Sequence, residues 1–147
     1  MGTREGTPTN VEIQDHLSDA ASGSVLTVDD QAPFRALLRR VVDETPGLVV
    51  VGEAGSGESA VELARALEPD LVLMDVRMPG IGGIAATLQI KMLRPATLVV
   101  LVSTLHPDQL AEAADGSRAD VTVCKSDLRP SVLEDIWRRH GPPRPLE

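Results

Sequence analysis

Short runs of apolar, mostly β-branched residues alternate along this chain with longer stretches in which apolar residues recur at helical spacing. The pattern predicts a helix after each of five strands, at residues 25–28, 48–51, 71–74, 97–102 and 121–124. The helix expected at residues 107–114 has the weakest apolar pattern. Five strand and helix units in sequence leave few ways of burying both kinds of element in one core.

The expected strands are apolar without alternation, which is typical of strands covered on both faces. This composition and the repeating strand–helix order predict an α/β fold, a doubly wound five-stranded parallel sheet with helices on both faces. Among the common strand orders, five strands suit the flavodoxin-like order 2-1-3-4-5. In that order the ligand crevice lies at the carboxyl ends of the first and third strands.

The length of 147 residues, of which 42% are hydrophobic, suits one ordinary domain. We expect this domain at residues 25–140. A flexible N-terminal leader is expected at residues 1–24, where Gly, Thr, Ser, Asp and Pro prevail, and a C-terminal tail at residues 141–147.

Charge and cysteine content exclude several classes of protein. A formal net charge of −8 argues against direct nucleic-acid binding, which needs clustered Lys and Arg to neutralise phosphates. The sequence has no apolar run long enough to predict a membrane span. Its single cysteine, Cys124, cannot form an internal disulfide, so we expect a cytoplasmic protein in which Cys124 is a small buried residue.

Chemically useful side chains stand where the expected strands end. Asp29 and Asp30 follow the first strand, Asp75 follows the third, Ser103 ends the fourth and Lys125 follows the fifth. Because parallel strands point the same way, these residues are expected to gather at one edge of the sheet.

Three neighbouring carboxylates repel one another, and a divalent cation relieves the repulsion. A ligand set made only of oxygen favours Mg²⁺, which completes its coordination with water and phosphate. The site therefore suits phosphoryl chemistry, with Asp75 as the nucleophile that forms an acyl phosphate. Lys125 and Mg²⁺ would neutralise charge on the phosphoryl oxygens, and Ser103 would hydrogen-bond the attached group.

Four separated motifs resemble the receiver domain of two-component response regulators. They are Val28-Asp29-Asp30-Gln31, Leu73-Met74-Asp75-Val76-Arg77-Met78-Pro79-Gly80, Ser103 and Lys125. The similarity extends from residue 25 to about residue 140 and keeps the motifs in the family's order.

The resemblance implies a role for each site residue. Asp75 is the phosphoacceptor and takes its phosphoryl group from a histidine of a sensor kinase. Asp30 ligates Mg²⁺ directly, Asp29 through water, and Arg77 through its backbone carbonyl. Ser103 and Lys125 match the family's switch hydroxyl and phosphate-pairing lysine.

The resemblance also implies a signalling protein rather than an enzyme. Such a protein acts on a downstream protein partner or through a DNA-binding output domain that this chain does not contain, and a homodimer is left open. One residue and one short segment depart from the family's pattern. Thr122 stands where receivers usually carry Tyr or Phe, three positions before Lys125, and Ser117-Arg118-Ala119 replaces the usual turn of small residues. We therefore expect a different readout of phosphorylation.

Three other interpretations stay open at this point. Asp29 and Asp30 suit the start of a helix, where Asp is a favoured cap. Residues 55–60 fit the G-x-G-x-x-A form of a dinucleotide-binding loop, although Glu53 and Ala54 separate it from the expected strand and Ser103 and Lys125 are left without a role. A Mg²⁺-dependent phosphohydrolase of the haloacid-dehalogenase type would need a second carboxylate two residues after the nucleophile, where this chain has Arg77.

Two aromatic residues lie in apolar helical stripes. Phe34 belongs to the stripe Phe34, Leu37, Leu38, Val41, Val42, and Trp137 belongs to the stripe of the last helix. We therefore expect both rings in the core. The three histidines lack the spacing of metal ligands.

Overall fold

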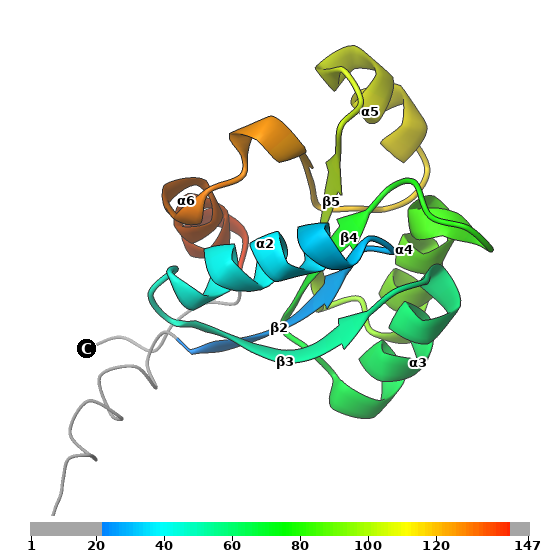
Figure 1. Cartoon of the computed structure of the whole chain (residues 1–147). Coiled ribbons are helices and arrows are strands. Elements are labelled where there is room, and N and C mark those ends of the chain that lie inside the picture. The colour runs from blue at the N-terminus through cyan, green and yellow to red at the C-terminus, as the bar shows by residue number, and fades with distance from the viewer. Residues whose placement is uncertain (1–21, 142–147) are drawn as a thin grey trace, which may run out of the picture.

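The computed structural model describes residues 22–141. Within this range five strands form one parallel sheet (Figure 1). The strands are β2 (Gly23–Val28), β3 (Leu48–Ala54), β4 (Leu71–Asp75), β5 (Leu98–Ser103) and β6 (Val121–Cys124). Their order across the sheet is β3-β2-β4-β5-β6, which confirms the predicted order 2-1-3-4-5. Almost all of the predicted leader and tail lie outside the described residues.

A helix follows each strand, as predicted. The helices are α2 (Ala32–Asp43), α3 (Gly57–Leu67), α4 (Gly82–Leu93), α5 (Pro107–Ala114) and α6 (Pro130–His140), with a short 3₁₀ helix, η1 (Lys125–Asp127), before α6. Proline stands in the first turn of α2, α5 and α6, where its missing N–H leaves no hydrogen bond unmade. The weakly patterned helix α5 has the predicted bounds. None of the described helices is long and apolar enough to cross a membrane.

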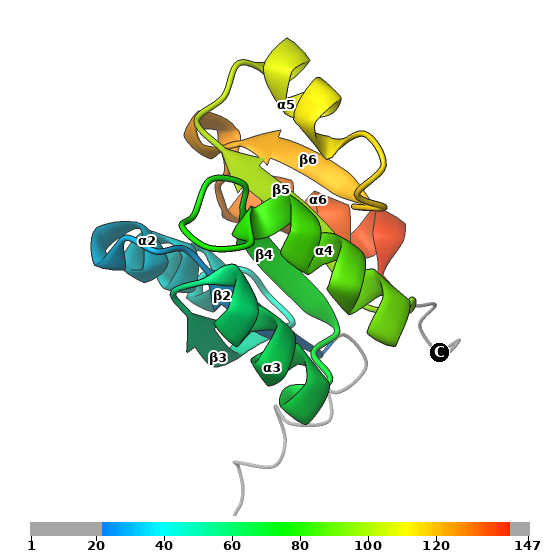
Figure 2. The same ribbon diagram turned by 90° about the vertical axis from the view of Figure 1, so that its right-hand side faces the viewer.

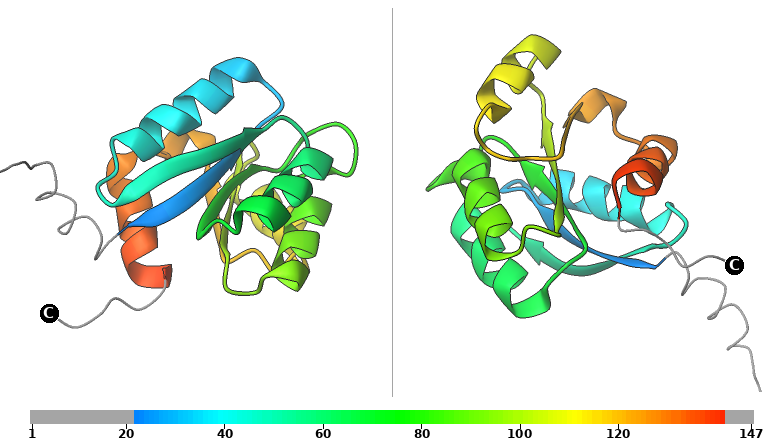
Figure 3. Two further views of the ribbon diagram at one scale, coloured as in Figure 1. Left: turned by 90° about the horizontal axis from the view of Figure 1, so that it is seen from below. Right: turned by 180° about the vertical axis from the view of Figure 1, so that it is seen from behind.

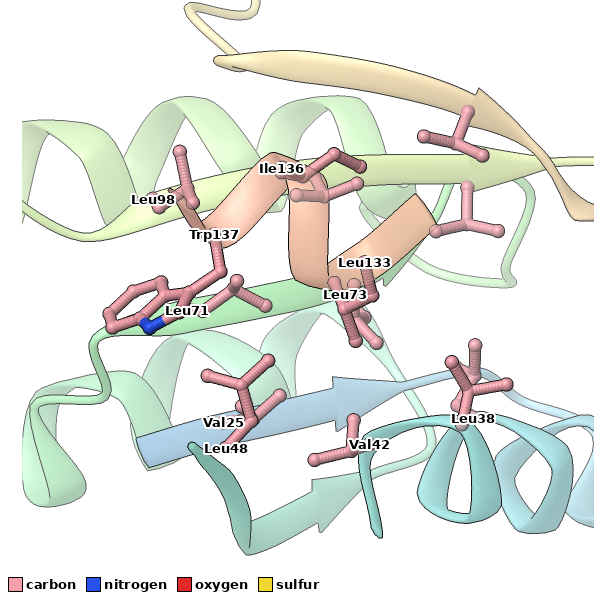
Figure 4. Packing of buried hydrophobic residues seen from close by; sticks show 14 residues of the cluster. Val25, Leu38, Val42, Leu48, Leu71, Leu73, Leu98, Leu133, Ile136 and Trp137 are labelled. Carbon is pink, nitrogen blue, oxygen red and sulfur yellow. The ribbon is translucent and has the colours of Figure 1, made fainter. Parts of the chain in front are cut away.

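The sheet is the middle of three layers, with α2 and α6 on one face and α3 and α4 on the other (Figures 2 and 3). One core cluster joins α2 and α6 to the sheet, and Figure 4 shows Trp137 and Leu133 of α6 packed over Leu71 and Leu73. A second cluster joins α3, α4 and Leu110 of α5 to the opposite face. Burial on both faces explains why the central strands β2, β4 and β5 are continuously apolar, whereas the edge strand β3 exposes Val49 and Val51.

The buried face of α2 differs from the predicted stripe, and the buried face of α4 carries no clear apolar stripe in the sequence. In α2 the core takes Leu38, Val41 and Val42, whereas Leu37 is 43% exposed because it lies on the flank of the helix. In α4 the apolar residues that are fully buried are Ala86 and Ile90, whereas Leu88 is exposed. Apolar residues occur all round α4, so helical periodicity alone could not identify its buried face. Trp137 is 5% exposed, which confirms its place in the core.

The end of α4 carries a buried lysine at the edge of the sheet where the strands begin. Lys91 is 8% exposed, and its Nζ donates hydrogen bonds to Pro95 O (2.9 Å), Thr97 O (2.8 Å) and Asp120 Oδ2 (2.8 Å). The same oxygen of Asp120 accepts a hydrogen bond from Val99 N–H at 2.8 Å. All three donors of this ammonium are therefore satisfied, and they tie α4 to the starts of β5 and β6.

Candidate functional site

The register of the sheet brings the predicted site residues to one edge. Val28 pairs with Met74, Asp75 with Val102, and Ser103 with Cys124. The next residues along these strands therefore leave the sheet side by side at their carboxyl ends, as the parallel arrangement predicts. All of the residues expected at this edge lie there: Asp29, Asp30, Asp75, Ser103 and Lys125.

The three acids form a compact group. Oxygen atoms of Asp29, Asp30 and Asp75 all lie within 4.8 Å of one another, and Asp29 and Asp75 are buried whereas Asp30 is exposed. Asp29 Oδ1 accepts a hydrogen bond from Gln31 N–H at 2.9 Å, which joins the acid to the start of α2. Asp29 Oδ2 is buried and accepts no hydrogen bond. A buried oxygen with free lone pairs, beside two other carboxylates, fits a hard cation such as Mg²⁺.

Lys125 brings a positive charge to the same edge from the end of β6. Its Nζ lies 2.8 Å from Asp29 Oδ2, at angles outside those of a hydrogen bond, and 3.6 Å from Asp75 Oδ1. The Lys125 side chain is 12% exposed. This ammonium balances part of the acidic charge and lies where it could contact a group attached to Asp75.

The charge on Asp75 is disfavoured by its surroundings. Burial, and after it the neighbouring Asp29 carboxylate, raise the pKa of Asp75 from 3.8 to about 6. The Lys125 ammonium and a hydrogen bond from the Arg77 backbone oppose the rise in the pKa of Asp75. Asp75 is thus mostly ionised at neutral pH, but its charge is unfavourable there. A bound cation would stabilise this charge, and a proton would remove it.

A pH-dependent contribution to stability follows from this shift. The folded pKa of Asp75 is raised, so between pH 3.8 and about 6 the unfolded chain loses the proton that the folded protein keeps. The contribution of Asp75 to stability is therefore fully present below pH 3.8 and is lost as the pH rises through this window. Allowing for solvent screening, we expect wild type to lose about 1 to 2 kcal/mol relative to Asp75→Asn across it. Urea unfolding of both proteins from about pH 4 to about pH 7, in EDTA, measures this difference; parallel curves would contradict it.

Ser103 and Thr122 lie on the side of the edge nearest α5. Ser103 is 1% exposed, and its Oγ accepts a hydrogen bond from Leu105 N–H at 3.0 Å. Cys124 is a half-buried free thiol whose Sγ donates to Leu105 O at 3.5 Å. Thr122 is exposed on β6, so the side chain that stands in the usual aromatic position leaves this face of the strand uncovered.

The loop that carries Asp75 into α4 is held by α3 and by close backbone contacts. Glu58 Oε2 accepts a hydrogen bond from Ile81 N–H at 3.3 Å. Gly57 lies so close to Gly82 O that an added Cβ would approach that oxygen to 2.7 Å, and a Cβ on Gly83 would collide with the backbone of Asp75. Nothing in the sequence around Glu58 predicts this contact, because the partner is a backbone group 23 residues further along the chain.

Two sequence interpretations change in the light of these contacts. Strand β3 continues through Ala54, so the two residues counted against a dinucleotide-binding loop are part of the strand. However, Gly57 of that loop serves packing, since it fits against Gly82 O. Ser56 is the N-cap of α3, and its Oγ accepts the hydrogen bond of Ser59 N–H at 3.1 Å. The second change concerns Phe34, which is half buried rather than in the core because the first turn of α2 extends past the sheet. Its ring centroid lies 3.7 Å from Lys125 Nζ.

Comparison with known proteins finds one family throughout. The family described as the response regulator receiver domain matches residues 25–136. The response regulator GacA of Pseudomonas syringae pv. syringae is 45% identical over 109 residues, which is 74% of this chain and 42% of GacA. The response regulator UvrY of Escherichia coli K12 is 44% identical over 85 residues, or 58% of this chain and 38% of UvrY. The chain thus spans about two-fifths of the length of these relatives.

Solved structures agree with these relatives. The response regulator domain of Thermotoga maritima CheB is 33% identical, with a TM-score of 0.71 over 81% of this chain and 96% of that one. A two-component response regulator of the LuxR family from Aurantimonas sp. SI85-9A1 is 31% identical, with a TM-score of 0.73 over 84% of this chain and 91% of that one. Because the family's model matches most of the chain and the fold matches that of solved response regulator domains, the chain belongs to the receiver domains of two-component response regulators.

Proposed function

We propose that this chain is a phosphoacceptor switch in which Asp75 takes a phosphoryl group from a histidine of a sensor kinase. The observation that supports this proposal best is the Lys125 ammonium, which lies 2.8 Å from Asp29 and 3.6 Å from Asp75 at an edge shared by three carboxylates. A lone acid at a strand end would need no such partner. The arrangement suits an acid that receives a charged group.

The transfer is a displacement at phosphorus. A carboxylate oxygen of Asp75 attacks and forms the new O–P bond, while the P–N bond to the donor histidine breaks and the imidazole leaves with the electron pair. Lys125 would neutralise charge on a phosphoryl oxygen, and the Ser103 hydroxyl would donate a hydrogen bond to another. Asp29, Asp30, Asp75 and the Arg77 backbone carbonyl would hold Mg²⁺, which supplies further positive charge to the phosphoryl oxygens.

A phosphohydrolase is the competing function. Arg77 occupies the position two residues after Asp75 where such an enzyme needs a second carboxylate as general acid, so we propose that the chain is not an enzyme. Two of the relatives are protein-glutamate methylesterase/protein-glutamine glutaminases, and the chain spans only 27% and 28% of their lengths.

The test uses a small phosphodonor in place of the kinase. Incubation with acetyl phosphate and Mg²⁺ should add one phosphoryl group per chain by intact mass, and tandem mass spectrometry should locate it on Asp75. The addition should disappear in EDTA. With p-nitrophenyl phosphate no sustained release of nitrophenol is expected. A stable, unmodified mass with the donor would refute the switch, and multiple turnover would favour the phosphohydrolase.

The remaining parts of the proposal concern context. We expect a sensor histidine kinase as the donor, and either a downstream protein partner or a DNA-binding output domain as the receiver of the response. A homodimer is a further arrangement to test. The single cysteine, Cys124, cannot form an internal disulfide, which is in keeping with the cytoplasmic location expected from the sequence.

A further inference from the structure

The surroundings of Lys125 include an aromatic ring besides the acids. The ammonium has Asp29 Oδ2 at 2.8 Å, Asp75 Oδ1 at 3.6 Å and the ring centroid of Phe34 at 3.7 Å. A cation within about 6 Å of an aromatic centroid is attracted by the negative face of the ring. With the side chain only 12% exposed, this attraction acts where water screens it weakly.

The two lysines of the chain are held in opposite ways. Lys91 Nζ gives all of its donors to three oxygen atoms, so it is fixed in one position. Lys125 Nζ has a single oxygen within 3 Å, and the ring attracts it without occupying a hydrogen-bond donor. An ammonium held by a ring keeps N–H donors available for an incoming phosphoryl oxygen. A third carboxylate in that place would compete for them.

Phe34 is placed by the same loop that carries the acids. Gln31, the N-cap of α2, donates its N–H to Asp29 Oδ1 at 2.9 Å, and Arg35 Nη1 donates to Asp29 O at 2.8 Å. Phe34, which lies between them in the first turn of α2, is therefore fixed relative to Asp29. Figure 1 shows α2 starting beside the ends of β2 and β4. Phe34 is the sole phenylalanine of the sequence and lies outside both core clusters.

From these contacts we infer that Phe34 is a positioning residue for phosphoryl transfer, whose ring holds the Lys125 ammonium over the acidic edge while leaving its donors free. The inference rests on the proposed function, because Lys125 acts there on the group transferred to Asp75. Phe34 itself touches neither the phosphoryl group nor its donor. Its effect on the reaction passes through the place of the Lys125 ammonium.

The test compares two variants that separate the effect of the aromatic ring from the effect of an apolar side chain of similar size. Phe34→Leu keeps an apolar side chain, and we expect it to slow phosphorylation of Asp75 by acetyl phosphate about five- to tenfold. Phe34→Tyr keeps the ring and should stay within about twofold of wild type. Intact mass against time, at fixed Mg²⁺ and donor, measures both rates. Leu37→Ala, one turn along α2 at an exposed position, is the matched control and should leave the rate unchanged.

A spectroscopic readout shows whether the ring acts through Lys125. Isotope labelling of lysine alone gives side-chain signals from Lys91 and Lys125, and Lys91→Arg assigns them by removing one. The ring current of Phe34 should shift the Lys125 Hε signals upfield in wild type and Phe34→Tyr, and this shift should vanish in Phe34→Leu. The Lys91 signals, from the opposite edge of the sheet, should not move and so verify that Phe34→Leu is folded.

Each outcome of these experiments either supports or overturns the positioning role of Phe34. A normal rate in Phe34→Leu, or an unshifted Lys125 signal in wild type, overturns the positioning role and leaves the proposed function intact. Equal slowing in Phe34→Leu and Phe34→Tyr also overturns it, since the shape of the side chain would then matter rather than the ring. Failure of wild type itself to be phosphorylated on Asp75 overturns the proposed function, and the positioning role with it.

Discussion

Asp75→Asn is expected to abolish phosphoryl transfer to the chain, with a rate below about a thousandth of wild type. The amide oxygen of asparagine carries no negative charge, so it is a poor nucleophile for phosphorus, and no acyl phosphate can form on it. The substitution is nearly isosteric at a position that is 5% exposed, so packing at the sheet edge should be kept. Loss of function should therefore occur in a protein that is at least as stable as wild type near neutral pH, because the disfavoured charge is gone.

Phosphorylation by acetyl phosphate and Mg²⁺, followed by intact mass, measures the loss. Asp127→Asn is the matched control, since Asp127 is an exposed acid two residues after Lys125 and outside the acid group. It should be phosphorylated like wild type. If Asp75→Asn still gained a phosphoryl group, tandem mass spectrometry would show which residue carries it, and Asp75 could not be the principal acceptor.

Lys91→Met is expected to lower the free energy of unfolding by about 3 kcal/mol. The methionine fills similar space but donates no hydrogen bond, so Pro95 O and Thr97 O lose their partner and Asp120 loses its counter-charge. Asp120 keeps the hydrogen bond from Val99 N–H, and its side chain is 31% exposed, which limits the penalty. Urea unfolding at neutral pH measures the change.

A surface ion pair supplies the control for this prediction. Arg139 Nε lies 3.1 Å from Asp135 Oδ2, but the two side chains are 71% and 46% exposed. Arg139→Met should therefore change stability by less than about 1 kcal/mol. Lys91 is remote from the acid group, so Lys91→Met should still accept a phosphoryl group at temperatures where it is folded. A loss of stability no larger than that of Arg139→Met would show that the Lys91 network does not stabilise the fold.

Much of the fold could be predicted because its determinants are local. Continuous β-branched runs and helical spacing placed all five strands and five helices, and β6 and α5 have the predicted bounds. The other strand bounds moved by one to three residues at an end: β3, for example, extends to Ala54 because Glu53 and Ala54 still pair with Thr27 and Val28 of β2. Such pairing depends on a neighbouring strand, which a single segment does not encode.

The location of the candidate site residues could also be predicted, because the residues that follow parallel strands lie at one edge of the sheet. Asp29, Asp75, Ser103 and Lys125 each stand at a strand end, and strand ends are visible in the sequence. Their roles in phosphoryl transfer stay predictions that the experiments above address.

By itself the sequence determined the alternation of elements and the set of charged groups at the strand ends, since periodicity and strand ends are properties of contiguous residues. Only the tertiary structure decided which face of α4 is buried, which lysine is locked by oxygen atoms, and that Phe34 leaves the core to lie over Lys125. The physical reason is that these contacts join segments far apart in the chain. Their distances depend on how whole helices pack against the sheet, and no single stretch of residues determines that packing.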